Sequence, residues 1–236
     1  MGRPPIEEIV VILDATDPWN EVQRAVIMQE FRALQHEIPR FARVSLYTLT
    51  SASSELPAPA LQLCNPGNVA DLSRSIPLGR PGVRLVATPQ MVELRWRDGF
   101  IARLDSIFEA QGASAGTRRS PIMETIRSAA ISVFGAAPRD TAPPRKLYIF
   151  SDMLQHTDRY SHYADTAWTA ADAQLLADLS AMGTTALLGA EVHLFLLDRD
   201  FVGRGPGNSR SALLEFWHTY FAAQGATLLR VRRIEG

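Results

Sequence analysis

The stretch "VVILDATDPW", residues Val10 to Trp19, joins an apolar run to a short acidic loop and a proline. The run extends back to Ile6 and is rich in Ile and Val with little alternation, which is typical of a β-strand covered on both faces. Asp14, Thr16 and Asp17 follow where this strand ends. The stretch therefore predicts a central strand of a parallel sheet with polar side chains at its carboxyl end.

Strand and helix patterns alternate along most of the chain. Apolar residues at helical spacing predict helices, and short apolar runs rich in β-branched and aromatic residues predict strands. The predicted strands are 6–13, 42–50, 146–151, 191–198 and 227–232, and the predicted helices are 18–37, 90–111, 121–134, 169–182 and 211–224. This order predicts an α/β fold with a doubly wound, mostly parallel central sheet and helices on both faces. No internal repeat appears, so we expect one domain over residues 1–236.

Residues 51–89 depart from this pattern. The stretch contains six prolines and three glycines, and we interpret it as a long excursion with little regular structure. Structureless loops of this length are uncommon inside compact domains unless they are functional or disordered. One hypothesis is therefore that the chain is a scaffold whose recognition element is this excursion.

The composition is that of an ordinary globular protein and restricts its partners. Lys and Arg together number 24 and Asp and Glu 25, so the net charge of −1 gives no reason to expect a nucleic-acid partner. Cys64 is the single cysteine, which excludes an internal disulfide and a cysteine-cluster zinc site. No stretch approaches the roughly 20 apolar residues that span a bilayer. A cytoplasmic location is favoured, and a soluble fragment of an anchored protein remains an alternative.

Polar residues lie at three predicted loops that the topology would bring to one edge of the sheet. Asp14, Thr16 and Asp17 follow the first strand, Ser120 precedes the helix at 121–134, and Asp152 follows the strand at 146–151. In open α/β sheets, ligands bind at the carboxyl ends of the strands where the strand order reverses. Hydroxyl and carboxylate oxygens are ligands that Mg²⁺ accepts. These loops are therefore the candidate functional site.

This set of loops resembles the metal-ion-dependent adhesion site of the von Willebrand factor A domain family. Asp14 and Thr16 match its first element, Ser120 its second and Asp152 its third, and the order of elements matches from Ile6 to Arg232. The resemblance implies a Rossmann-like doubly wound sheet and a Mg²⁺ ion, or Mn²⁺ or Ca²⁺ in its place. It also implies a protein–protein interaction module that binds a protein partner. Pro18 stands where the family has a second hydroxyl, and no glycine follows Asp152.

Two of the loops also have a purely structural interpretation. Asp17 before Pro18 and Ser120 before Pro121 both match a helix N-cap followed by proline at the first helical position. This interpretation explains Asp17 and Ser120 but leaves Asp14, Thr16 and Asp152 without a role.

A second functional class, an enzyme, is open as well. His156 follows Asp152 closely in the sequence. With a metal held by Asp14 and Asp152, His156 as general base would give a metal-dependent phosphoesterase or nuclease.

Overall fold

A twisted β-sheet forms the centre of the computed structural model, which describes residues 4–49, 58–67, 88–112, 119–135, 142–181, 185–198 and 205–235. Within these segments the sheet has six strands in the order β3-β2-β1-β4-β5-β6. All neighbouring strands pair in parallel except β2 and β3, which are antiparallel. The predicted doubly wound, mostly parallel α/β fold is confirmed.

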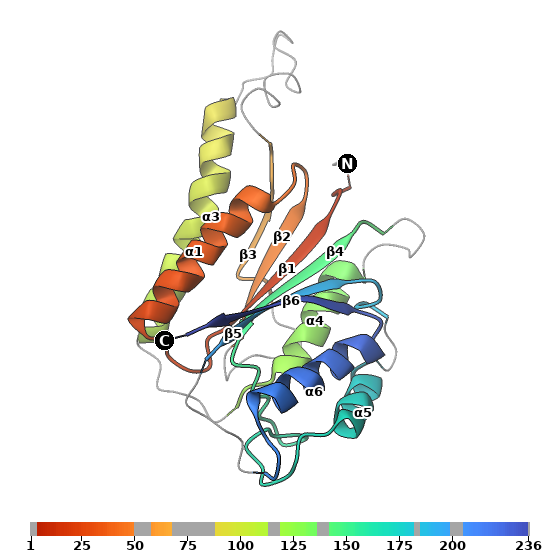
Figure 1. Cartoon of the computed structure of the whole chain (residues 1–236). Helices are drawn as coiled ribbons and strands as arrows, with labels where there is room; N and C mark the ends of the chain where they lie inside the picture. Colours follow the sequence, from red (N-terminus) through yellow and green to blue (C-terminus); the bar gives the residue numbers. More distant parts are fainter. Residues whose placement is uncertain are drawn as a thin grey trace.

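The elements alternate as the sequence predicts (Figure 1). The strands are β1 Glu8–Asp14, β2 Arg43–Leu49, β3 Leu61–Cys64, β4 Arg145–Ser151, β5 Glu191–Leu197 and β6 Thr227–Ile234. The helices are α1 Glu21–Glu37, α3 Pro89–Gly112, α4 Ile122–Phe134, α5 Ala170–Ala181 and α6 Arg210–Ala223.

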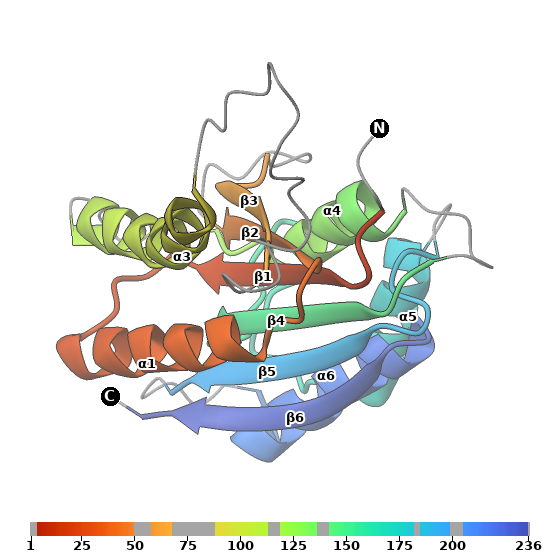
Figure 2. The same cartoon turned by 90° about the horizontal axis from the view of Figure 1, so that it is seen from above.

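Helices cover both faces of the sheet (Figures 1 and 2). Helices α1 and α3 pack on the face that carries Ile9, Val11 and Leu13, and α4, α5 and α6 lie on the face that carries Val10 and Ile12. Successive side chains of a strand point to opposite faces, so β1 contributes to both cores. This explains why its sequence is apolar without alternation.

Stacked aromatic rings tie the first of these layers together. The rings of Phe150 on β4 and Phe195 on β5 lie 4.3 Å apart between centroids, and Phe31 of α1 contacts Phe150 at 5.0 Å. Phe31 also lies 5.6 Å from Phe100 of α3. Rings in these arrangements stabilise the core beyond the apolar area that they bury. They fix the position of β4, whose carboxyl end borders the candidate site, against β5 and α1.

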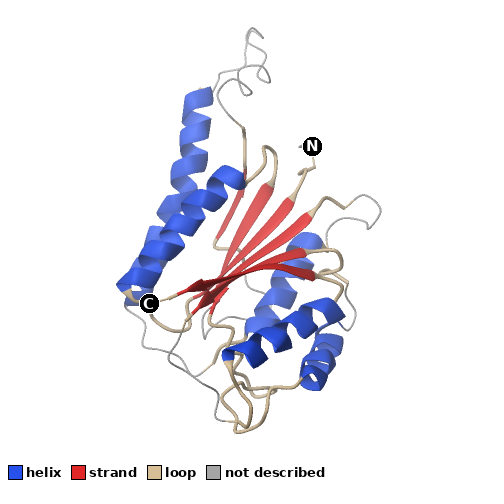
Figure 3. Ribbon diagram, viewed as in Figure 1, coloured by secondary structure: helices blue, strands red, loops and turns tan. Residues whose placement is uncertain are grey.

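The strand order reverses between β1 and β4. The chain proceeds from β1 outward to β2 and β3, and then returns to place β4 on the other side of β1. The carboxyl ends of these two strands lie side by side at the edge of the sheet where the chain leaves for α1 and for the segment before α5 (Figure 3). This is the position at which open α/β sheets bind ligands.

The start of the first helix differs from the prediction. Helix α1 begins at Glu21, and its N-cap is Asn20, whose side chain accepts a hydrogen bond from the Gln23 backbone while the Gln23 side chain accepts one from Asn20. Asp17 therefore does not cap this helix. Between Asp17 and this helix, Trp19 is buried and packs edge-on against Phe108 of α3, 5.2 Å between centroids, which holds residues 17–19 outside the helix.

The predicted excursion also contains structure that the sequence did not indicate. Strand β3 lies within residues 51–89 and pairs with β2, from Leu61 opposite Leu46 to Cys64 opposite Arg43. The expectation of little regular structure is wrong for this part. Residues 50–57 and 68–87 lie outside the described segments, so the hypothesis of a recognition loop there stays a prediction.

Strand β6 is the edge strand on the side of the sheet away from β3. Arginines alternate with apolar residues along it. Arg232 pairs with Glu30 of α1, and Arg233 lies 2.6 Å from an oxygen of Asp198. None of the helices in the described segments combines the length and the apolar character that crossing a bilayer requires.

Candidate metal centre

Asp14, the last residue of β1, is the centre of a buried hydrogen-bond network. Its Oδ1 accepts hydrogen bonds from the Thr16 backbone N at 3.1 Å and from Thr16 Oγ1 at 2.6 Å. Its Oδ2 accepts one from Ser151 Oγ at 2.6 Å, and Ser151 is the last residue of β4. The carboxylate therefore joins the ends of the two strands at which the sheet order reverses.

The environment of Asp14 disfavours its charge. Burial raises the pKa of the Asp14 carboxyl above its ordinary value of 3.8, hydrogen bonds from Ser151 and Thr16 lower it, and the charge of Asp17 raises it. A buried carboxylate next to a second carboxylate is stabilised by a nearby cation. The network therefore has the electrostatic character of a site that gains from binding a positive ion.

The hydrogen bond to Asp14 also orients Thr16. A hydroxyl has one proton and two acceptor lone pairs, and the Thr16 proton points toward Asp14. A cation on the other side of Thr16 would meet oxygen lone pairs. Asp14 and Thr16 are two residues apart, and this spacing allows Asp14 to orient the hydroxyl of Thr16.

Ser120 does not cap α4, contrary to the structural interpretation. The N-cap position is Pro121, which has no side-chain group to make a capping hydrogen bond. Ser120 instead forms an isolated antiparallel bridge with His156, with backbone hydrogen bonds of 2.9 Å and 3.0 Å. Its buried Oγ has no hydrogen-bond partner within the described segments.

Asp152 follows β4 at a sharp change of chain direction. Its Oδ1 accepts a hydrogen bond from the Leu154 backbone N at 2.9 Å. Met153 between them has φ of 62°, which is uncommon for a residue with a side chain. The carbonyl of Met153 accepts a hydrogen bond from Trp217 Nε1 at 2.9 Å, so α6 holds this turn in place.

One cavity brings most of these side chains together. Its volume is about 340 Å³, and it is lined by Thr16, Asp17, Arg119, Ser120, Asp152, Leu154, His156 and Tyr163. Three of the four predicted metal ligands, Thr16, Ser120 and Asp152, line it directly. Asp14 does not line the cavity, but it accepts a hydrogen bond from the Thr16 hydroxyl, which does.

His156 also lines this cavity, close to Asp152 as the catalytic alternative requires. Its Nδ1 lies 2.7 Å from Ser161 Oγ, and its ring meets that of Tyr163 edge-on at 5.3 Å. The ring is therefore held from two sides, with Nε2 as its remaining nitrogen.

The available donors suit a hard divalent cation bound through oxygen. In the described part of the chain, no three His, Cys, Asp or Glu side chains are grouped so that they could hold a metal ion. A cation here would depend on the hydroxyls of Thr16 and Ser120 together with Asp152. Mg²⁺ keeps several waters and needs only a few protein oxygens, so this donor set is sufficient for it. The unpartnered Ser120 oxygen is the observation that supports this match.

Two residues of the site have roles that the sequence did not indicate. Ser151 links β4 to Asp14, and in the sequence it is simply the last residue of the predicted strand at 146–151. Gln155 is buried, accepts a hydrogen bond from the Met123 backbone N at 3.0 Å, and donates one to Glu124 at 2.8 Å. These bonds join the segment after Asp152 to the first turn of α4, next to Ser120.

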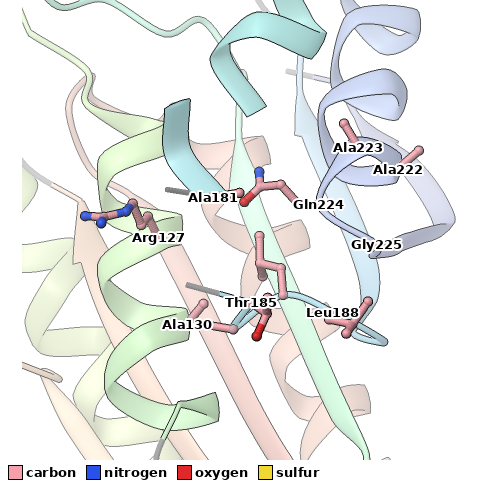
Figure 4. Close-up of a pocket in the computed structure, with 11 residues that line it drawn as sticks. Arg127, Ala130, Ala181, Thr185, Leu188, Ala222, Ala223, Gln224 and Gly225 are labelled. Atoms are coloured by element: carbon pink, nitrogen blue, oxygen red, sulfur yellow. The ribbon is translucent and has the colours of Figure 1, made fainter. Parts of the chain in front are cut away.

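A second cavity lies near the amino ends of β5 and β6, whereas the candidate metal centre lies at the carboxyl ends of the strands (Figure 4). Its volume is about 330 Å³, and its lining includes Arg127 from α4, Leu188, Gln224 and Gly225. Gly225 has φ of 74°, and a β-carbon there would lie 2.5 Å from Leu188 Cδ1. The cavity is lined largely by alanines and other small side chains, and Arg127 is its charged residue.

Comparisons with known proteins do not assign a family. No protein-family model matches the sequence, and no curated protein matches it. The conserved hypothetical protein BatB from Bacteroides thetaiotaomicron is similar in structure, with a TM-score of 0.44 and 11% identity over 97% of this chain and 90% of that chain. An aerotolerance-related membrane protein from Bacteroides fragilis is similar with a TM-score of 0.37 and 8% identity over 96% of this chain and 90% of that chain. The function is therefore inferred from the geometry of this chain.

Proposed function

We propose that this chain is a protein–protein interaction module that binds its partner through a divalent metal ion. The proposed site consists of Asp14, Thr16, Ser120 and Asp152: the last three line the cavity and would be the direct ligands, and Asp14 positions Thr16. Mg²⁺ is the expected ion, with Mn²⁺ or Ca²⁺ as alternatives. The observation that carries the proposal is the buried, unpartnered Ser120 oxygen beside the cavity that Thr16 and Asp152 also line. Burying a hydroxyl without a partner is costly, and a bound cation or its water would remove that cost.

Each residue has a distinct role in this proposal. Thr16 and Ser120 contribute neutral hydroxyl oxygens, and Asp152 contributes a carboxylate. Asp14 orients the Thr16 hydroxyl and adds negative charge behind it. Asp17 lines the same cavity and can replace, through water, the hydroxyl that Pro18 lacks. Asp152 is the single carboxylate among the direct ligands, so a bound divalent ion keeps positive charge at its open coordination positions.

That residual charge defines the partner. An ion held largely by hydroxyls attracts an anionic ligand, and Arg119 in the same lining adds a second positive group. Tyr163 is exposed at the cavity and can contact a partner surface. Tyr and Arg are enriched where proteins meet. We therefore expect the partner to present an aspartate or glutamate side chain.

The test is metal-dependent capture of a partner. The immobilised chain is incubated with native lysate in 5 mM Mg²⁺, washed, and eluted with EDTA, using the wild type and Asp152→Asn. Retention of a specific protein that requires Mg²⁺ and is lost in Asp152→Asn supports the proposal. Asp158→Asn is the matched control, because Asp158 is an exposed carboxylate six residues further along. Capture that is equal in EDTA and Mg²⁺ would contradict the proposal.

The position of His156 favours one second candidate, a metal-dependent phosphoesterase or nuclease. His156 lines the same cavity as Asp152, and Ser161 fixes its ring. A general base must lie within reach of the water that it activates, and Nε2 is the ring nitrogen available for that role. Hydrolysis of bis(p-nitrophenyl) phosphate in Mg²⁺ or Mn²⁺ tests this candidate. Turnover must be lost in both His156→Ala and Asp152→Ala for the candidate to stand.

A further inference from the structure

Helix α5 presents apolar side chains to the outside of the molecule. Its buried residues are Ala173 and Ala177, whereas Leu175 is 59% exposed and Leu179 is 54% exposed. The two leucines are four residues apart and therefore lie on one side of the helix. Figure 1 shows α5 at the periphery of its layer, beside α6. The pair forms an exposed apolar stripe that the fold of one chain does not use.

A groove lies next to this stripe. Its volume is about 520 Å³, and it runs between α4, α5 and the segment that follows β4. The apolar part of its lining consists of Met123, Tyr160, Leu176 and Leu179. Leu179 thus belongs both to the stripe and to the wall of the groove. A helix with leucines one turn apart matches a groove of this kind.

The charges around the groove and along the helix are complementary. Arg127 and Arg159 line the groove together with Glu124, which accepts a hydrogen bond from Gln155, so the groove carries one net positive charge. Arg127 lies at the carboxyl end of α5, where its Nε donates to the Ser180 carbonyl at 2.9 Å, and Arg159 has no ionic partner within the described segments. Helix α5 itself carries Asp172 in its first turn and Asp178 beside Leu179. One face of the chain therefore holds both an acidic, leucine-bearing helix and a basic, apolar groove.

We propose that two copies of this chain form a symmetric dimer in which each α5 lies in the groove of the other copy. The helices run antiparallel about a two-fold axis, so that Leu175 of one copy meets Leu179 of the second copy. This orientation brings Asp172 to the end of the groove where Arg127 lies, and Asp178 toward Arg159. A self-complementary patch of this kind is what a two-fold interface requires. A second copy is the favoured occupant, because its α5 carries the leucine pair and the acidic residues that match this groove.

The dimer leaves the candidate metal centre accessible. In the segment after β4, Gln155 and Thr157 line the groove, whereas Leu154 and His156 line the metal cavity. Successive side chains of this segment therefore alternate between the two cavities. Each dimer would therefore present two metal cavities to its partners. The inference does not depend on the metal proposal, and either can fail alone.

Sedimentation velocity measures this association directly. Wild type at 1 to 200 μM in 150 mM NaCl is expected to shift from monomer to dimer, with a micromolar dissociation constant, since paired short helices form a small interface. Leu175→Asp places a charge at the centre of the contact twice per dimer and should raise that constant at least tenfold. Leu94→Asp is the matched control, because Leu94 is an exposed leucine on the helix α3 and should leave the association unchanged.

A charge-reversal experiment distinguishes a specific interface from nonspecific association. Arg159→Glu, an exposed change that the fold tolerates, should weaken the dimer, and the double variant Arg159→Glu with Asp178→Arg should restore it. A wild type that stays monomeric at 200 μM overturns the proposal. A dimer that survives both Leu175→Asp and Arg159→Glu also overturns it, since the interface would then lie elsewhere.

Discussion

Replacing His162 with phenylalanine is expected to remove a large part of the acid sensitivity of this fold. His162 is completely buried, and its ring centroid lies 5.1 Å from those of Tyr160 and Trp168 and 4.8 Å from that of Phe216. Neither ring nitrogen has a hydrogen-bond partner within the described segments. Phenylalanine has a similar shape, and it cannot be protonated.

The size of the effect follows from the pKa of the buried ring. Burial lowers the pKa of His162 from its ordinary value of 6.5 to about 3. The nearby backbone of Gln155 raises this pKa, but by less than burial lowers it. Below pH 6.5 the unfolded chain binds a proton that the folded chain does not, so stability falls with decreasing pH until about pH 3. The complete shift in the pKa of His162 corresponds to a stability loss of roughly 5 kcal/mol at low pH. At pH 4 the loss is about 3 kcal/mol. Well above pH 6.5 neither the folded nor the unfolded chain binds this proton, so His162 makes no pH-dependent contribution to stability.

Thermal melting between pH 7.5 and pH 4 checks this prediction. We expect wild type and His162→Phe to melt within a few degrees of each other at pH 7.5. At pH 4 the variant should melt higher by about 6–12 °C, since 1 kcal/mol shifts Tm by about 2–4 °C in a chain of this size. His218→Phe is the control, because His218 is exposed on α6. Parallel curves for wild type and His162→Phe across this range would refute the reasoning.

Three further changes test the site and the fold. Without metal at pH 7.5, Asp14→Asn should raise Tm, because burial raises the pKa of Asp14 and its charge then costs stability; this gain should shrink as the pH falls toward 3.8, and a lower Tm at pH 7.5 would contradict it. Ser120→Ala should change metal-free stability by less than about 1 kcal/mol, since its oxygen has no partner within the described segments. The same variant should lose at least tenfold in Mg²⁺ affinity by calorimetry, and an unchanged affinity would exclude Ser120 as a ligand. Asn20→Ala should cost about 1 kcal/mol in urea denaturation, because it removes the capping box, whereas Asp17→Ala should cost less than half of that; equal losses would contradict the observed start of α1.

The sequence predicts the frame of this fold well because most of its information is local. Strand β1 is apolar throughout since helices cover both of its faces, and its sequence alone indicates that burial. The predicted helices and parallel strands lie within three residues of those observed. In these elements periodicity and tertiary packing agree.

The parts that the sequence did not predict depend on distant contacts. Strand β3 has four residues in a stretch rich in proline and glycine, and it is a strand because it pairs with β2. Asp17 and Pro18 form a strong local helix start, but burial of Trp19 against α3 keeps them outside the helix. Ser120 likewise pairs with His156 through the backbone, which no local pattern shows.

The candidate site divides in the same way. Asp14, Thr16 and Asp152 could be predicted because strand ends at a reversal of strand order lie together. The role of Ser151 as a donor to Asp14, and of Gln155 as a link to α4, depends on side-chain directions that only the folded chain determines. The sequence thus indicated which loops meet at this candidate site, whereas the structure distinguishes the residues that line its cavity from those that orient them.

Direct binding of Mn²⁺ tests the central claim most closely. Free hexaaqua Mn²⁺ gives a sharp electron paramagnetic resonance spectrum that broadens when the ion binds to protein. Titration of the wild type should remove one equivalent of free signal per chain, Mg²⁺ should restore that signal by competition, and Asp152→Asn should leave the signal unchanged. A free signal that persists with 1 mM wild-type protein, or a loss that is equal in Asp152→Asn, would contradict a divalent-ion site at the ends of β1 and β4.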